Sequence, residues 1–140
     1  MTATTTSTTA ISTPARRSHP LVKATLVSGL VAAAATTTMA VAADAAGVPL
    51  AIDGEQIPFL GFAQMSLLGA VIGGLIVAAL NRWSDRPRQR FEIVAVVLTL
   101  LSCVPSVALP PDTATKLTLV ATHLVAAAII VPVVARRATR

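Results

Sequence analysis

The sequence predicts an all-α membrane protein, a bundle of four transmembrane helices with both termini on the cytoplasmic side (N-in/C-in). Three observations predict this fold. The 140 residues are 54% hydrophobic and only 12% charged, whereas charged residues make up about 25% of soluble globular chains. Four apolar runs have roughly the length that a helix needs to cross a hydrocarbon layer of about 30 Å. Ten of the eleven Lys and Arg residues fall on one predicted side, as in cytoplasmic segments of membrane proteins.

The N-terminal residues 1–20 form a polar, Thr-rich tail, which we expect to be disordered and cytoplasmic because it has few apolar side chains to bury. We expect Arg16, Arg17 and Lys23 to keep this end inside. The first span, 21–43, is weakly hydrophobic and rich in Ala and Thr, which suit helix packing. Residues 40–44, Ala-Val-Ala-Ala-Asp, also resemble a signal-peptide cleavage site, and cleavage there is an alternative that would leave three spans.

The first outer loop, 44–58, places Asp53-Gly54 between two short apolar stretches. Asp-Gly is a strong signal for a two-residue hairpin turn, so a short β-hairpin and an irregular loop are the two alternatives. The second span, 59–80, carries small residues four apart, Gly69 with Gly73 and Ala70 with Gly74. Such spacing predicts a helix-packing face, and we favour contact within the bundle over a homodimer seam.

An arginine-rich break separates the second and third spans, and its charges cannot follow the apolar runs into hydrocarbon. We therefore expect its four arginines to lie in a short cytoplasmic loop, with the C-terminal arginine pair on the same side. Trp83, within this break, is predicted to lie at the level of the lipid headgroups. The residues that determine the predicted topology are Arg82, Arg86, Arg88, Arg90, Arg136 and Arg137.

The third span, 91–109, carries Glu92 in its predicted first turn, where the helix dipole favours a carboxylate. Two prolines end this span, and the outer turn that follows is so short that the third and fourth spans must be antiparallel neighbours. Asp112 or Thr113 is expected to cap the fourth span, 115–135.

Three segments resemble a domain-of-unknown-function family of small four-span membrane proteins found in actinobacteria. They are residues 81–91 (Asn-Arg-Trp-Ser-Asp-Arg-Pro-Arg-Gln-Arg-Phe), 112–117 (Asp-Thr-Ala-Thr-Lys-Leu) and 123–132 (His-Leu-Val-Ala-Ala-Ala-Ile-Ile-Val-Pro), followed by an arginine pair. The resemblance covers a membrane domain of residues 21–137, which leaves a basic tail at 138–140. It implies a four-span fold and a cell-membrane location, and it brings no activity.

Polar side chains from all four spans fall at a similar depth, roughly 8 to 12 Å below the outer boundary at 1.5 Å of rise per residue. An intramembrane histidine is a functional candidate, because unpaired ring nitrogens are costly in hydrocarbon. We expect His123 to bond to Gln64 or Ser102 as structural glue. A proton-handling site and a ligand or metal contact are the alternatives. The predicted intramembrane polar cluster comprises His123, Gln64, Ser102 and Thr37.

Nothing in the sequence resembles an enzyme, since no span carries a carboxylate pair and no nucleophile has an evident base. We expect no metal site, because Cys103 is the only cysteine and cannot form a cysteine-based zinc site within one chain. We also expect no cofactor, since the sequence has no glycine-rich phosphate loop. The leading interpretation is a multi-pass, non-enzymatic structural or accessory subunit of the cell membrane. The alternatives are a small transporter or proton-coupled module that uses the polar layer, and a signal-bearing exported protein.

The expected partners follow from the same charge pattern. The basic cytoplasmic face predicts contact with anionic lipid headgroups, and a second membrane protein or another copy of the chain is the further expectation. Nucleic acid is excluded, because the basic residues are not interleaved with stacking aromatics.

Overall fold

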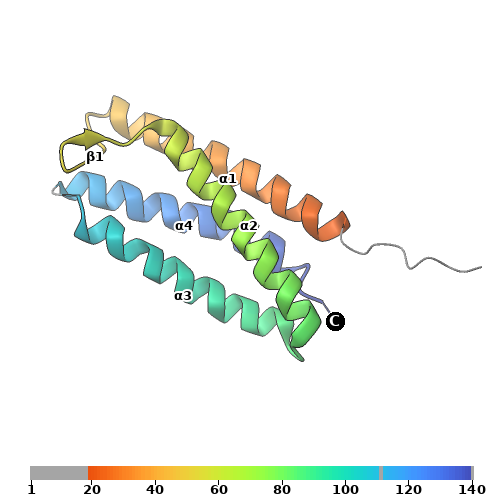
Figure 1. Ribbon diagram of the computed structural model, residues 1–140. Helices are drawn as coiled ribbons and strands as arrows, with labels where there is room; N and C mark the ends of the chain where they lie inside the picture. Colours follow the sequence, from red (N-terminus) through yellow and green to blue (C-terminus); the bar gives the residue numbers. More distant parts are fainter. Residues whose placement is uncertain (1–18, 111, 140) are drawn as a thin grey trace, which may run out of the picture.

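The computed structural model describes residues 19–110 and 112–139, which form four helices and one two-stranded hairpin (Figure 1). The elements are α1 (His19–Ala45), β1 (Ala51–Ile52), β2 (Glu55–Gln56), α2 (Phe59–Trp83), α3 (Pro87–Ala108) and α4 (Thr113–Ala135). Each helix is long and apolar enough to cross a membrane. The predicted fold class is therefore confirmed: the chain is an all-α membrane protein with a four-helix bundle.

The helices run back and forth along the bundle, so that the connections alternate between its two ends (Figure 1). The start of α1, the α2–α3 connection and the end of α4 meet at one end, here called the inner end. The hairpin and the α3–α4 connection meet at the other, the outer end. α1 packs most extensively against α2, and α4 contacts α1, α2 and α3. This arrangement brings the basic segments of the described chain to one side, as the predicted topology requires.

The prediction that four arginines occupy one loop is wrong in its local structure. Arg82 belongs to the last turn of α2, and Arg88 and Arg90 belong to the first turns of α3. The connection is short because Pro87 begins α3, where its missing N–H costs no helical hydrogen bond. Glu92 consequently lies beyond the first turn and pairs with Arg88 at 2.9 Å. A position on a helix end is compatible with the predicted topology, because the long stem of an arginine can extend along the helix while its charge remains in water.

The predicted β-hairpin is present at the outer end. β1 pairs with β2 in antiparallel register, Ala51 with Gln56 and Ile52 with Glu55. The turn residues Asp53 and Gly54 have φ of +53° and +83°, as the two central positions of a type I′ turn require.

Leu50, just before β1, packs against the helices and so attaches the hairpin to the bundle. Its side chain is 2% exposed and lies in an apolar cluster that joins three helices and the hairpin. This outer cluster consists of Ala40, Leu50, Phe62 and Leu119, with Val48 and Ile57 packed against it. Leu50 has a φ of +40°, a region that residues with a Cβ rarely occupy and that costs of order 1–3 kcal/mol. The burial of its side chain holds this strained backbone in place.

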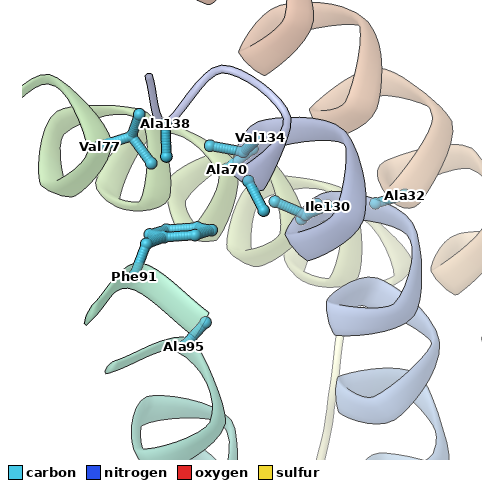
Figure 2. Close-up of a cluster of buried hydrophobic side chains, with 9 residues drawn as sticks. Ala32, Ala70, Val77, Phe91, Ala95, Ile130, Val134 and Ala138 are labelled. Atoms are coloured by element: carbon cyan, nitrogen blue, oxygen red, sulfur yellow. The ribbon is translucent and has the colours of Figure 1, made fainter. Parts of the chain in front are cut away.

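A larger apolar cluster fills the inner half of the bundle (Figure 2). Phe91 projects from α3 toward α2, and Val77 and Val134 are fully buried beside it. The other members of this inner cluster are Ala32, Ala70, Ala95, Ile130, Ala135 and Ala138. Most are small, which allows the helix backbones to approach closely.

The ends of the chain are described only in part. Of the predicted tail 1–20, residues 1–18 lie outside the described residues, and His19 and Pro20 begin α1. At the C-terminus, Ala138 is 6% exposed and belongs to the inner cluster. The amide of Asn81 in α2 donates to the carbonyl of Arg137 at 3.0 Å. This bond attaches the segment after α4 to the end of α2.

Candidate functional site

One row of small residues on α2 meets a matching row on α1, and we call this contact the α1–α2 seam. Its residues recur every three or four positions on each helix, so each set lies on one helical face. The seam consists of Thr25, Gly29, Ala32 and Thr36 on α1 and of Ser66, Ala70 and Gly74 on α2.

The closest approach in the seam is at Gly74. A Cβ added there would lie 2.6 Å from the Thr25 hydroxyl oxygen, and one added at Gly29 would lie 2.9 Å from the Ala70 Cβ. Gly69, in contrast, has nothing within 4 Å of an added Cβ. The predicted packing face therefore lies within the bundle along Ala70 and Gly74. Gly69 takes no part in it.

Thr36 and Ser66 form the polar centre of the seam. Their hydroxyl oxygens are 2.9 Å apart, and Thr36 Oγ1 is also 2.9 Å from the carbonyl of Ala32 in its own helix. Since a carbonyl only accepts, Thr36 donates to Ala32 and the Ser66 hydroxyl donates to Thr36. Within the described residues, this is the one hydrogen bond between side chains of different helices. Both groups are buried, and both hydroxyl protons are used in hydrogen bonds: that of Thr36 within α1 and that of Ser66 between α2 and α1.

His123 bonds within its own helix. Its Nδ1 lies 2.7 Å from the carbonyl oxygen of Leu119, which also accepts from the Thr122 hydroxyl at 2.8 Å. Because the carbonyl cannot donate, Nδ1 carries the proton of this hydrogen bond. The predicted bond from His123 to Gln64 or Ser102 is wrong, because a carbonyl four residues earlier is always within reach on a helix.

The other members of the predicted polar cluster are also separate from one another. Gln64 is exposed on α2. Ser102 is half-buried on α3 and donates to the carbonyl of Thr99 at 2.7 Å. The hydroxyl of Thr37 is buried without a hydrogen-bond partner. Between the described helices, the polar contact is made instead by Thr36 and Ser66. The position of Ser66, four residues before Ala70 and eight before Gly74, could have indicated this from the sequence.

The outer end carries a second polar arrangement at the start of α4. Asp112 caps this helix, as predicted, by accepting from the backbone N–H of Thr115 at 2.8 Å and from its hydroxyl at 3.1 Å. The backbone hydrogen bond from Thr115 is the main cause that holds the pKa of Asp112 below its ordinary value. The hydrogen bonds favour the ionised carboxylate, so the cap is strongest when Asp112 is charged.

The inner end is basic and includes the exposed Trp83, whose side chain is 76% exposed. Seven exposed basic side chains surround this end in the described chain, against two exposed acidic ones, Asp85 and Glu92. The basic residues are Lys23, Arg82, Arg86, Arg88, Arg90, Arg136 and Arg137.

Two shallow, open depressions adjoin each other along α3 and together form what we call the α3 groove. The first lies at the inner end and is lined by Asp85, Arg86, Pro87, Arg88, Gln89, Glu92 and Ala138. The second lies farther along the helix and is lined by Gln89, Glu92, Ile93, Val96 and Val97. Neither depression includes His123, Gln64, Ser102 or Thr37. In the described residues, no group of three or more His, Cys, Asp or Glu side chains could hold a metal ion.

Comparison with known proteins identifies the family of the chain and no activity. No curated protein and no solved structure matches it. A family of unknown function, DUF6069, matches residues 16–140, which include all four helices and the hairpin. The chain therefore belongs to the DUF6069 family of unknown function.

Proposed function

We propose that this protein is a non-enzymatic structural or accessory subunit of the cell membrane, which displays its outer hairpin to a partner membrane protein or to another copy of the chain. The buried polar groups of the seam support the proposal, because Thr36 and Ser66 use their protons in packing. We also propose that the family is the actinobacterial four-span group that residues 81–91 resemble. Lipid is the partner of the basic inner end, with anionic headgroups preferred and nucleic acid not bound.

The observation that carries the proposal is the strained anchor of the hairpin. Leu50 is held at φ +40° with its side chain buried, while the turn and second strand, residues 53–56, are exposed. A strained backbone persists only where the surrounding structure over-determines it, and such positions concentrate at functional sites. The fold thus fixes the position of a polar surface at the outer end of the bundle, and the proposed topology puts this end outside the membrane.

The test compares the size of the complex in native membranes, solubilised gently, with that of the purified protein. Wild type should migrate as a larger assembly. Replacing Asp53, Glu55 and Gln56 together by Asn, Gln and Ala should release the monomer, because these side chains are exposed at the hairpin. Leu60→Ala is the matched control, since Leu60 is 66% exposed at the start of α2, just after the hairpin. A wild-type protein that is already monomeric in its native membrane would contradict the proposal.

The rival function, a proton-coupled module, is tested in the same preparation. Purified protein in vesicles with a pH-sensitive dye should give no flux above empty vesicles, for wild type and for His123→Leu alike. A flux that His123→Leu abolishes would favour the rival, because imidazole titrates near pH 6.5.

A further inference from the structure

The α3 groove crosses from the charged inner end into the apolar length of α3. Its two depressions share Gln89 and Glu92, so they are continuous along the helix. Each has a volume of about 360 Å³, which is at the lower end of the range for small-molecule sites, roughly 300–1,000 Å³.

The chemistry of the groove changes along its length. The inner depression presents the guanidinium groups of Arg86 and Arg88 together with the carboxylates of Asp85 and Glu92. The second presents Ile93, Val96 and Val97, each more than half exposed. In a membrane, this second part lies beside hydrocarbon, which a soluble protein, a nucleic acid or a free metabolite does not enter. An occupant of the whole groove must therefore have a polar head and an apolar chain.

The charges around the groove determine which kind of polar headgroup it can bind. Glu92 accepts from Arg88 Nε at 2.9 Å, so this carboxylate is already balanced by a cation within the groove. The inner end as a whole carries seven exposed basic side chains against two acidic ones. Guanidinium groups bind phosphate oxygens through strong, charge-assisted hydrogen bonds. The surplus of positive charge favours a head with net negative charge over a zwitterionic one.

We propose that the α3 groove binds one anionic phospholipid, with its phosphate at Arg86 and Arg88 and one acyl chain along Ile93, Val96 and Val97. This inference rests on the proposed contact between the basic inner end and lipid headgroups, and it narrows that contact to a single site. α3 is the least buried of the four helices, so a bound lipid there would cover part of the apolar surface that the bundle leaves open.

The head of the lipid is tested by native mass spectrometry of the full chain in detergent, titrated with dioleoyl phosphatidylglycerol, phosphatidylethanolamine or phosphatidylcholine. Wild type should bind one phosphatidylglycerol before any further lipid. Replacing Arg86 and Arg88 by Gln should weaken this first binding about tenfold, as expected for the loss of charge-assisted hydrogen bonds. The matched control replaces Arg136 and Arg137 by Gln, since both are exposed at the same end and do not line the groove. The control should change affinity less than threefold.

The acyl chain is tested with two tryptophan substitutions on α3. Val96→Trp fills the apolar depression and should weaken phosphatidylglycerol binding roughly tenfold. Leu101→Trp is the control, because Leu101 is 62% exposed and lies outside the groove. All variants must keep the wild-type helicity in circular dichroism, so that weaker lipid binding cannot be attributed to unfolding.

Three outcomes would overturn the lipid site: equal losses in the two arginine variants, equal losses in the two tryptophan variants, or binding of phosphatidylethanolamine or phosphatidylcholine as tight as that of phosphatidylglycerol. None of these results affects the displayed hairpin, which is tested by the size of the native complex. The experiments can therefore refute the lipid-binding site and the partner-binding hairpin independently of each other.

Discussion

At the scale of single residues, the bundle is held by close contact between small side chains more than by polar bonds. Thr25 lies against the bare Cα of Gly74, and Ala70 lies against Gly29. Lipid tails are as apolar as the helix surfaces, so the hydrophobic effect does not drive helices together within a membrane. Van der Waals contact of this kind drives much of their association instead. The small residues of the seam thus determine how α1 is positioned against α2.

Gly74→Ala should destabilise the protein by roughly 1–3 kcal/mol, the usual cost of overpacking. The added Cβ would meet Thr25, whose branched side chain cannot turn aside freely. Gly69→Ala is the matched control, because its Cβ would enter open space and Ala favours the helix by up to about 1 kcal/mol. Unfolding in mixed micelles, followed by circular dichroism, measures both. Equal stability of the two variants would show that the seam is not tightly packed.

His123→Leu should lower stability by less than about 1 kcal/mol, because interhelical hydrogen bonds in membranes average only about 0.6 kcal/mol and this one is within a helix. The same unfolding measurement checks it, with Leu124→Ala, half exposed on the same helix, as the control. A loss of several kcal/mol would mean that the ring has a partner outside α4.

At the scale of elements, the spans and the hairpin could be predicted because apolar length and the Asp-Gly turn are local signals. The start of α3 could not, because a run of charged residues favours a loop, whereas α3 already begins at Pro87 and includes Arg88 and Arg90. The partner of His123 was missed for a similar reason. Counting residues from the ends of the spans places the polar residues at a common depth in the membrane. It does not show that the carbonyl of Leu119, in the same helix, takes the hydrogen bond of the His123 ring in place of a partner from another span.

The Asp112 cap of α4 should make the stability of the protein depend on pH in the acidic range. The folded-state pKa of Asp112 is lowered, so its contribution to stability is fully present above the unfolded value of about 3.9 and is lost as pH falls through the lower folded value. Asp112→Ala should therefore melt below wild type at neutral pH, and the difference should shrink under acidic conditions below about pH 4. Melting temperatures across this range check it. Glu55→Ala, on the exposed second strand, is the control and should show no such convergence.

At the scale of the whole molecule, the described basic residues lie almost entirely at one end, and Lys116 on α4 is the exception among them. This asymmetry could be predicted from the sequence, because basic residues mark the cytoplasmic side whether they lie in a loop or on helix ends. The groove along α3 could not be predicted, since it depends on how Ala138 folds back beside the α2–α3 connection.

Replacing Arg82, Arg86, Arg88 and Arg90 together by Gln should leave molecules in mixed orientations, because this connection carries the largest block of basic charge. Reporter fusions after Trp83 and Arg140 should report inside for wild type, and fusions at Asp53 should report outside. Lys116→Gln is the control and should insert as wild type does. Uniform insertion of the four-arginine variant would mean that the termini alone set the orientation.

The single tryptophan also decides how this protein can be observed. The chain has no tyrosine, so its near-ultraviolet absorbance and fluorescence arise almost wholly from Trp83. That ring is 76% exposed at the inner end, outside both apolar clusters. Since Trp83 is predicted to lie at the level of the headgroups, we expect its emission to respond to quenchers attached to headgroups and to change little when the interior of the bundle loosens.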